Sequence, residues 1–147
     1  MARGSRSGRV PSWARWALVA AWVAFIWSRS LFAGPESTEQ SDFVVGLLRP
    51  LLEGAGVTDV SMMSFIVRKV AHFSEYLVLG VLLSSTRDGG VPWQQLFLGL
   101  AVPVADETIQ MLIPGRSSQL TDVLIDFSGM LAGLLLGALV RSIKKRR

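Results

Sequence analysis

Long apolar segments separated by short polar intervals dominate the hydropathy pattern of the chain. Four of them, at about 16–33, 64–86, 91–113 and 121–140, approach the length and apolarity of membrane-crossing helices. The pattern therefore predicts an all-α fold, an integral membrane bundle of about four transmembrane helices formed by 1–147 as a single domain. The third segment is the least apolar, and its short apolar run also fits a re-entrant or protein-buried helix.

The first apolar segment follows a basic tail at 1–15, so it also fits a signal peptide. The segment is rich in tryptophan, and Leu31 and Ala33 make a poor small-residue cleavage site. We therefore predict a retained membrane helix.

A polar interval at 34–60 separates the first two segments. Within it, apolar residues recur at helical spacing, namely Phe43, Val44, Leu47, Leu48, Leu51 and Leu52. This spacing predicts a short amphipathic helix in the first outer loop, lying on the membrane surface or against the bundle, which Pro50 should kink or end. A simple connector is the alternative interpretation.

Composition narrows the class of protein. Half of the residues are apolar, and the net charge is +4. The basic residues gather in the tails at 1–15 and 141–147, beside apolar segments, which is typical of contact with anionic lipid head groups and not with nucleic acid. The chain has no cysteine and a single histidine, His72, which excludes thiolate and histidine-rich metal sites.

The distribution of basic residues predicts the topology. Ten of the fifteen Lys and Arg residues lie in the two tails and at Arg87, the turn after the second segment. By the positive-inside rule, this side is cytoplasmic, so both termini are cytoplasmic and the number of spans is even.

In that orientation, charged and polar residues of three segments fall at the outer end of the bundle. They are Lys69, His72, Glu75, Asp106, Glu107, Gln110, Arg116, Asp122 and Asp126. A charge at the centre of a membrane helix costs roughly 2.5–3.5 kcal/mol on insertion scales, and such groups usually mark a functional site. These residues therefore predict one outward-facing polar pocket.

The chemistry of these residues suggests two roles. The candidate catalytic residues, suited to acid–base work, are His72, Glu75, Asp106 and Glu107. The candidate substrate-binding residues are Lys69, Tyr76, Gln110, Arg116, Asp122 and Asp126. The carboxylates and His72 could hold a divalent ion, but their spacing fits no metal motif, so metal binding stays open. We predict no cofactor.

A repeat of glycines continues the acidic face of the fourth segment. Gly129, Gly133 and Gly137 are spaced four apart, which is typical of a face where two membrane helices approach closely. This face predicts helix packing inside the bundle and offers a possible contact for a homo-oligomer.

Two sequence blocks resemble the VanZ-like family of small membrane proteins. They are RKVAHFSEYLVLG at 68–80 and DETIQMLIPGRSSQLTDVLIDFSGMLAG at 106–133. Asp126 stands where the family often has Asn. The resemblance implies a multi-pass protein of the bacterial plasma membrane, in a family named for a member linked to teicoplanin resistance. It implies no settled reaction.

From these observations we expect a protein that binds or modifies a cell-envelope amphiphile, such as a membrane lipid or a lipid-linked envelope precursor. The family resemblance further implies a contribution to glycopeptide resistance, against teicoplanin in particular. One alternative is a non-catalytic membrane scaffold or permeability protein. A second is a metal-dependent membrane hydrolase, and whether the protein is an enzyme stays open.

Overall fold

The computed structural model describes residues 10–31, 34–87, 92–115 and 119–146, with residues 34–40 described by their backbone alone. These segments form five α-helices and contain no β-strand, which confirms the all-α prediction. The helices are α1 (Ser12–Ser30), α2 (Gly34–Gly54), α3 (Val60–Ser85), α4 (Trp93–Met111) and α5 (Leu120–Arg146).

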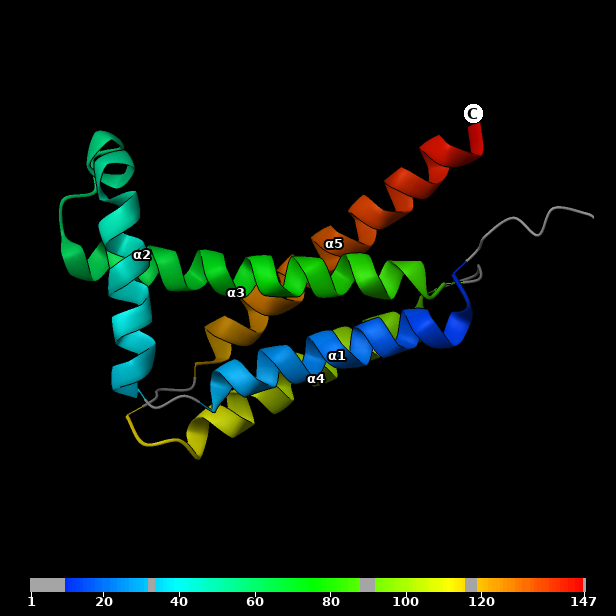
Figure 1. Ribbon diagram of the computed structural model, residues 1–147, viewed down its shortest axis with the longest axis horizontal. Helices are drawn as coiled ribbons and strands as arrows, with labels where there is room; N and C mark the ends of the chain where they lie inside the picture. The colour runs from blue at the N-terminus through cyan, green and yellow to red at the C-terminus, as the bar shows by residue number, and fades with distance from the viewer. Residues whose placement is uncertain (1–9, 32–33, 88–91, 116–118, 147) are drawn as a thin grey trace, which may run out of the picture.

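Helix α3 is the central element, because it contacts each of the other four helices. Its most extensive contact is with α5, which crosses it at an angle, while α1 and α4 lie side by side (Figure 1). Helix α2 packs on α3 alone among the described helices and stands roughly perpendicular to it at one end of the bundle (Figure 1). The C-terminal part of α5 extends beyond the other helices.

The main core lies where α1, α3, α4 and α5 meet. In α3 its buried apolar residues, Tyr76, Leu79 and Leu83, recur every three or four positions and so share one face. The other helices contribute Val19, Ile26, Val102, Met130 and Leu134. A smaller core joins Val45 of α2 to Met63 and Val67 at the start of α3.

Helix α3 begins at a side-chain cap. The carboxylate of Asp59 accepts hydrogen bonds from the backbone N–H of Ser61 at 3.1 Å and from the Ser61 hydroxyl at 2.6 Å. These hydrogen bonds hold the pKa of Asp59 below its usual value. The cap fixes the start of α3 four residues before the predicted segment.

Helix α2 is longer than the short amphipathic helix predicted for the first outer loop. It runs for 21 residues, and Pro50 lies inside it. Of the two effects predicted for Pro50, a kink or the end of the helix, the second is therefore wrong. A proline removes only its own N–H bond and crowds the preceding turn, so the residues after it can still bond in helical fashion. Accordingly, the N–H of Ala55 donates to the carbonyl of Leu51 at 3.1 Å.

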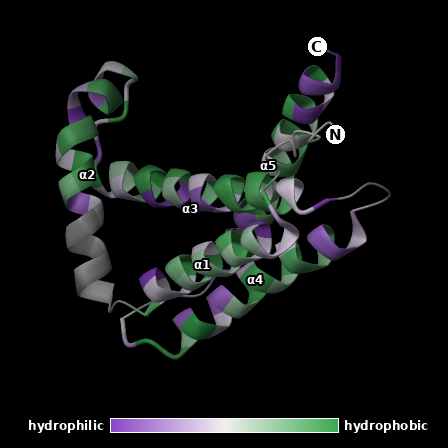
Figure 2. Cartoon of the chain, turned by 45° about the vertical axis from the view of Figure 1, so that its right-hand side comes forward, coloured by the Kyte–Doolittle hydropathy of each residue, from purple (hydrophilic) through white to green (hydrophobic). Residues whose placement is uncertain are grey.

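Many large apolar side chains are exposed on the helix surfaces. Figure 2 shows that hydrophobic residues occur along all five helices. By length and composition, one helix among the described residues, α5, is suited to crossing a membrane. Helix α3 is nearly as long, with 26 residues, but it contains the charged residues Arg68, Lys69 and Glu75. The helical fold is thus confirmed, while the four-span arrangement stays a prediction.

Candidate functional site

Polar side chains from four helices meet where the end of α1, the middle of α3, the end of α4 and the start of α5 come together. We call this group the polar cluster. Its members are Arg29, Ser30, Lys69, His72, Glu75, Asp106, Gln110, Asp122 and Asp126.

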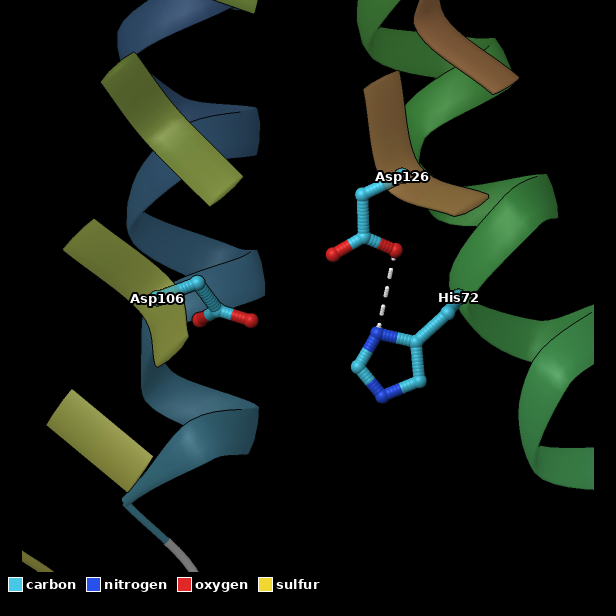
Figure 3. Close-up of side chains that lie close together, drawn as sticks. All are labelled: His72, Asp106 and Asp126. Carbon is cyan, nitrogen blue, oxygen red and sulfur yellow. Dashed lines mark ion pairs between the residues drawn. The ribbon is translucent and has the colours of Figure 1, made fainter. Parts of the chain in front are cut away.

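The centre of the polar cluster is formed by His72 of α3, Asp106 of α4 and Asp126 of α5 (Figure 3). The Nδ1 atom of His72 lies 3.2 Å from Oδ1 of Asp126, and one possible ligand atom from each residue lies within 4.8 Å of the others. Asp106 is 1% exposed and Asp126 is 0% exposed. Three helices therefore bring two buried carboxylates and an imidazole within reach of one small ligand.

Asp106 is held in place by hydrogen bonds from two neighbours. The hydroxyl of Ser30, the last residue of α1, donates to Oδ1 at 2.5 Å, and Nε2 of Gln110 donates to Oδ2 at 3.1 Å. The same Gln110 nitrogen lies 3.3 Å from the Ser30 hydroxyl, which closes the network. Both oxygens of Asp106 thus have a donor.

Asp126 lies in a different environment. Among the described residues neither of its carboxylate oxygens accepts a hydrogen bond, and the Nδ1 atom of His72 is likewise without one. Their contact is an ion pair when His72 is protonated, and it does not meet the geometry of a hydrogen bond. A buried carboxylate without hydrogen bonds is costly unless a positive charge balances it.

Two ion pairs flank the centre of the polar cluster. Lys69 of α3 pairs with Asp122 of α5, with 16% and 13% of the two side chains exposed. Arg29 of α1 lies 3.7 Å from Glu75 of α3, with 43% and 23% exposed. Each pair joins two helices, and each places a cation at the edge of the cluster.

Two further predicted residues lie next to the polar cluster. Tyr76 is fully buried one turn after His72, and its hydroxyl has no hydrogen-bond partner among the described residues. Oε2 of Glu107 accepts the backbone N–H of Gln119 at 2.9 Å, which ties the end of α4 to the start of α5. This contact gives Glu107 a structural role in addition to the chemical role predicted for it.

The structure brings together most of the side chains that the sequence singles out. Arg116 is the exception, since it lies outside the described residues. Sequence reasoning missed Ser30 as the partner of Asp106, and it missed Trp22, whose indole N–H donates to the carbonyl of Glu75 at 2.9 Å. Helical spacing could have indicated both residues, because Trp22, Ile26 and Ser30 are four apart and so share one face of α1.

The three glycines of α5 lie against α3. A Cβ atom added at any of them would come too close to α3, and the residues it would meet include Phe73, Gly80 and Ser84. The glycine face is therefore a helix-packing face within the chain. A homo-oligomer through this face stays a prediction, and it would require α3 to move away.

The fold and the polar cluster together define a class: an all-α bundle with charged side chains buried between helices whose outer surfaces are largely apolar. Comparison with known proteins gives the family. The model of the VanZ/LLP1 family matches residues 15–141, so the chain belongs to this family, as its sequence blocks predicted. Family membership and the apolar α5 helix both indicate membrane association. No curated protein and no solved structure matches the chain.

Proposed function

We propose that this protein is a multi-pass protein of the bacterial plasma membrane whose polar cluster faces outward and binds a cell-envelope amphiphile with an anionic head group. Helices α1, α3, α4 and α5 would cross the bilayer, and α2 would lie along its outer surface. Candidate ligands are a membrane phospholipid and a lipid-linked wall precursor.

The basic residues support this orientation. Arg15 donates to the carbonyl of Ser85, and Arg141 donates to Ser84, so both arginines lie at the end of α3 that is remote from the polar cluster. Lys144, Lys145 and Arg146 follow in the last turn of α5. Basic residues favour the cytoplasmic side, which leaves the polar cluster on the outer side.

The apolar surface supports a position within the bilayer. Each of the four helices exposes large apolar side chains, for example Phe25, Val78, Phe97 and Leu135. Large exposed apolar surfaces on a folded protein mark contact with a membrane or with a partner. A bilayer would cover all four helices at once.

The observation that carries the proposal is the position of the two cations at the edge of the polar cluster. The Nε atom of Arg29 lies 3.7 Å from Glu75, which is too long for a hydrogen bond, and the side chain is 43% exposed. Its guanidinium thus keeps donors for the charge-assisted hydrogen bonds that hold phosphate groups. Lys69 would supply a second positive charge, and Asp122 would position it.

The remaining residues fit two versions of this function. In the catalytic version, His72, Glu75 and Asp106 exchange protons with the bound head group. In the non-catalytic version, the same residues form ion pairs and hydrogen bonds that hold the four helices together. Replacing Asp106 by Glu separates the two versions. Catalysis should be lost, because it depends on the position of the carboxylate to within a fraction of an ångström. Ion pairs and hydrogen bonds that only hold the helices together should tolerate the longer side chain.

A binding experiment tests the proposal directly. The full-length protein would be purified in detergent and mixed with phosphatidylglycerol or with diacylglycerol, which lacks the phosphate, and retained lipid would be counted by native mass spectrometry. We expect selective retention of phosphatidylglycerol, reduced about tenfold or more in Arg29→Gln and Lys69→Gln, because each removes a charged hydrogen-bond donor. Arg68→Gln is the matched control, since Arg68 is exposed. Equal retention by all four proteins would contradict the proposal.

A susceptibility experiment connects the site to the envelope. A susceptible bacterial host would express the parent protein, His72→Gln, Asp106→Asn, Asp106→Glu or Asp122→Asn, with membrane abundance measured for each. We expect the parent to raise the teicoplanin concentration needed to inhibit growth, and the neutral variants to lose this effect at normal abundance. If every variant still protected the host, the polar cluster would not be needed for this function.

A further inference from the structure

We infer that His72, Asp106 and Asp126 bind one divalent transition-metal ion, with Zn²⁺ as the best fit. This inference deepens the proposed function, because the ion would lie in the same polar cluster that is proposed to bind the amphiphile. The geometry, burial and charge of the three side chains all favour a bound cation, and metal content can be measured independently of amphiphile binding.

The spacing of the three side chains is close to that of a metal site. One candidate ligand atom from each residue lies within 4.8 Å of the other two. Ligands of Zn²⁺ lie about 2.0–2.2 Å from the ion, so ligand atoms around one ion are about 3–4 Å apart. The three side chains therefore need to move inward by about 1 Å or less to share an ion. Figure 3 shows the carboxylates of Asp106 and Asp126 directed toward the imidazole of His72.

The hydrogen bonding of Asp126 supports a role as a metal ligand. Asp126 is 0% exposed, and among the described residues neither of its oxygens accepts a hydrogen bond. The Nδ1 atom of His72, 3.2 Å away, lacks a hydrogen bond as well. A buried carboxylate and a facing imidazole nitrogen, both without hydrogen-bond partners, are what a metal ion would satisfy together.

The charges of the cluster agree with a cation. Lys69 is paired with Asp122 and Arg29 with Glu75, so these cations have their own carboxylates. Among the described residues, Asp106 has no salt bridge, and Asp126 has one with His72 alone. Two buried carboxylates thus share a single imidazole, and a divalent cation would balance both while leaving that imidazole neutral.

The surroundings of Asp106 resemble those of a metal-binding carboxylate. Side chains that bind metals are usually held by hydrogen bonds from outside the coordination sphere, which fix their orientation. Ser30 and Gln110 supply such bonds, one to each oxygen of Asp106. Because Ser30 belongs to α1, the ion would connect all four helices of the bundle through direct or indirect contacts.

The ligand set selects the class of ion. One imidazole with two carboxylates suits Zn²⁺, and to a lesser degree Mn²⁺, better than Ca²⁺ or Mg²⁺, which prefer oxygen ligands alone. A three-residue site also leaves a coordination position open, as in catalytic zinc sites. An oxygen of an anionic head group could occupy that position, which would explain how an acidic cluster accepts an anion.

The test measures metal binding by the full-length protein in detergent. The protein would be stripped with a chelator, dialysed against ZnCl₂, separated from free metal by gel filtration and analysed for zinc by mass spectrometry, with the thermal unfolding midpoint as a second readout. We expect one zinc per chain and a higher midpoint in the parent and in Glu53→Gln, a matched control in exposed α2. We expect both effects to be lost in His72→Gln and Asp126→Asn.

Two results would overturn the inference: no stoichiometric zinc in the parent, or the same zinc content in the parent and both variants. The Asp126→Asn variant should stay folded, because the substitution is isosteric and removes a buried charge. Asp106→Asn serves as a further variant, since its amide can still form hydrogen bonds with Ser30 and Gln110. Retention of phosphatidylglycerol by the metal-free and by the zinc-loaded protein is measured in parallel. Lipid binding without zinc binding would contradict the metal site alone. Zinc binding without lipid binding would contradict the proposed amphiphile ligand alone.

Discussion

Gly80 of α3 and Gly133 of α5 face each other where the two helices cross, and neither position has room for a side chain. A Cβ atom added at Gly80 would lie 2.9 Å from the Cα atom of Gly133, and one added at Gly133 would lie 2.9 Å from the Cα atom of Gly80. The crossing is part of the most extensive helix contact in the chain. The separation of α3 and α5, and hence of His72 and Asp126, depends on this pair.

We predict that Gly80→Ala and Gly133→Ala each destabilise the protein by about 1–3 kcal/mol, because an added methyl group would force two backbones apart. The measurement is unfolding by denaturing detergent, followed by circular dichroism. The matched control is Gly46→Ala in α2, where an added Cβ atom meets nothing within 4 Å. Since Ala favours helix more than Gly does, the control should keep or slightly raise stability. Equal losses at all three positions would contradict the packing argument.

The hydrogen bond between Ser30 and Asp106 predicts a loss of stability when the hydroxyl is removed. Ser30 is buried, and its hydroxyl bonds both Asp106 and Gln110. Ser30→Ala should cost about 1 kcal/mol, the size of a typical hydrogen bond between membrane helices. Ser28→Ala should cost less, because Ser28 is exposed and bonds only the carbonyl of Phe25 in its own helix. The same unfolding assay checks both variants, and a larger loss at Ser28 would contradict the assignment.

The Lys69–Asp122 ion pair predicts strong coupling between its two members. Both side chains are largely buried, so removing one leaves the other without its partner. Lys69→Gln and Asp122→Asn should each cost about 1–3 kcal/mol, and the double variant should cost less than their sum. The exposed pair of Arg49 and Glu53 serves as a control, with an expected coupling of at most about 0.5 kcal/mol. Additive losses at Lys69 and Asp122 would show that the pair is not coupled.

Helical spacing accounts for what the sequence predicted well. Asp106 and Gln110 are four apart, and in the structure they are hydrogen-bonded neighbours. The glycines of α5 were expected on a packing face, and that face meets α3. In each case the relevant information lies within one helix.

Contacts between helices were predicted poorly, because spacing within one helix does not show which helix it faces. Ser30 ends an apolar segment, where a serine is equally typical of an exposed helix end, so its pairing with Asp106 had no separate signal. Gly80 stands without another glycine at four-residue spacing and did not indicate a crossing. Pro50 suggested a kink or the end of α2. The helix continues to Gly54, since a proline removes a single helical hydrogen bond.

The surface of α2 predicts how this helix lies on the membrane. Phe43, Leu47 and Leu51 are four apart and strongly exposed, whereas Arg49 and Glu53 pair on another face of the helix. An uncovered apolar face on a helix perpendicular to the bundle suits the membrane interface (Figure 1). Because the chain has no cysteine, Leu47→Cys and Arg49→Cys can each carry a single spin label. We expect the first label to be reached by oxygen from the lipid and the second by a water-soluble relaxant. Equal exposure of both labels to water would place α2 away from the bilayer.

The four-span arrangement predicts the side of the membrane on which three exposed positions lie. Val10 before α1 and Lys144 near the end of α5 should be cytoplasmic, and Ala55 after α2 should be external. Single cysteines at these positions, tested with a membrane-impermeant maleimide, should be labelled in intact cells at Ala55 alone and at all three after permeabilisation. If α5 were the only crossing helix, Val10 and Ala55 would share one side, so the reaction at Val10 distinguishes the two topologies. Labelling of Val10 in intact cells would therefore overturn the four-span arrangement, together with the outward orientation of the polar cluster that depends on it.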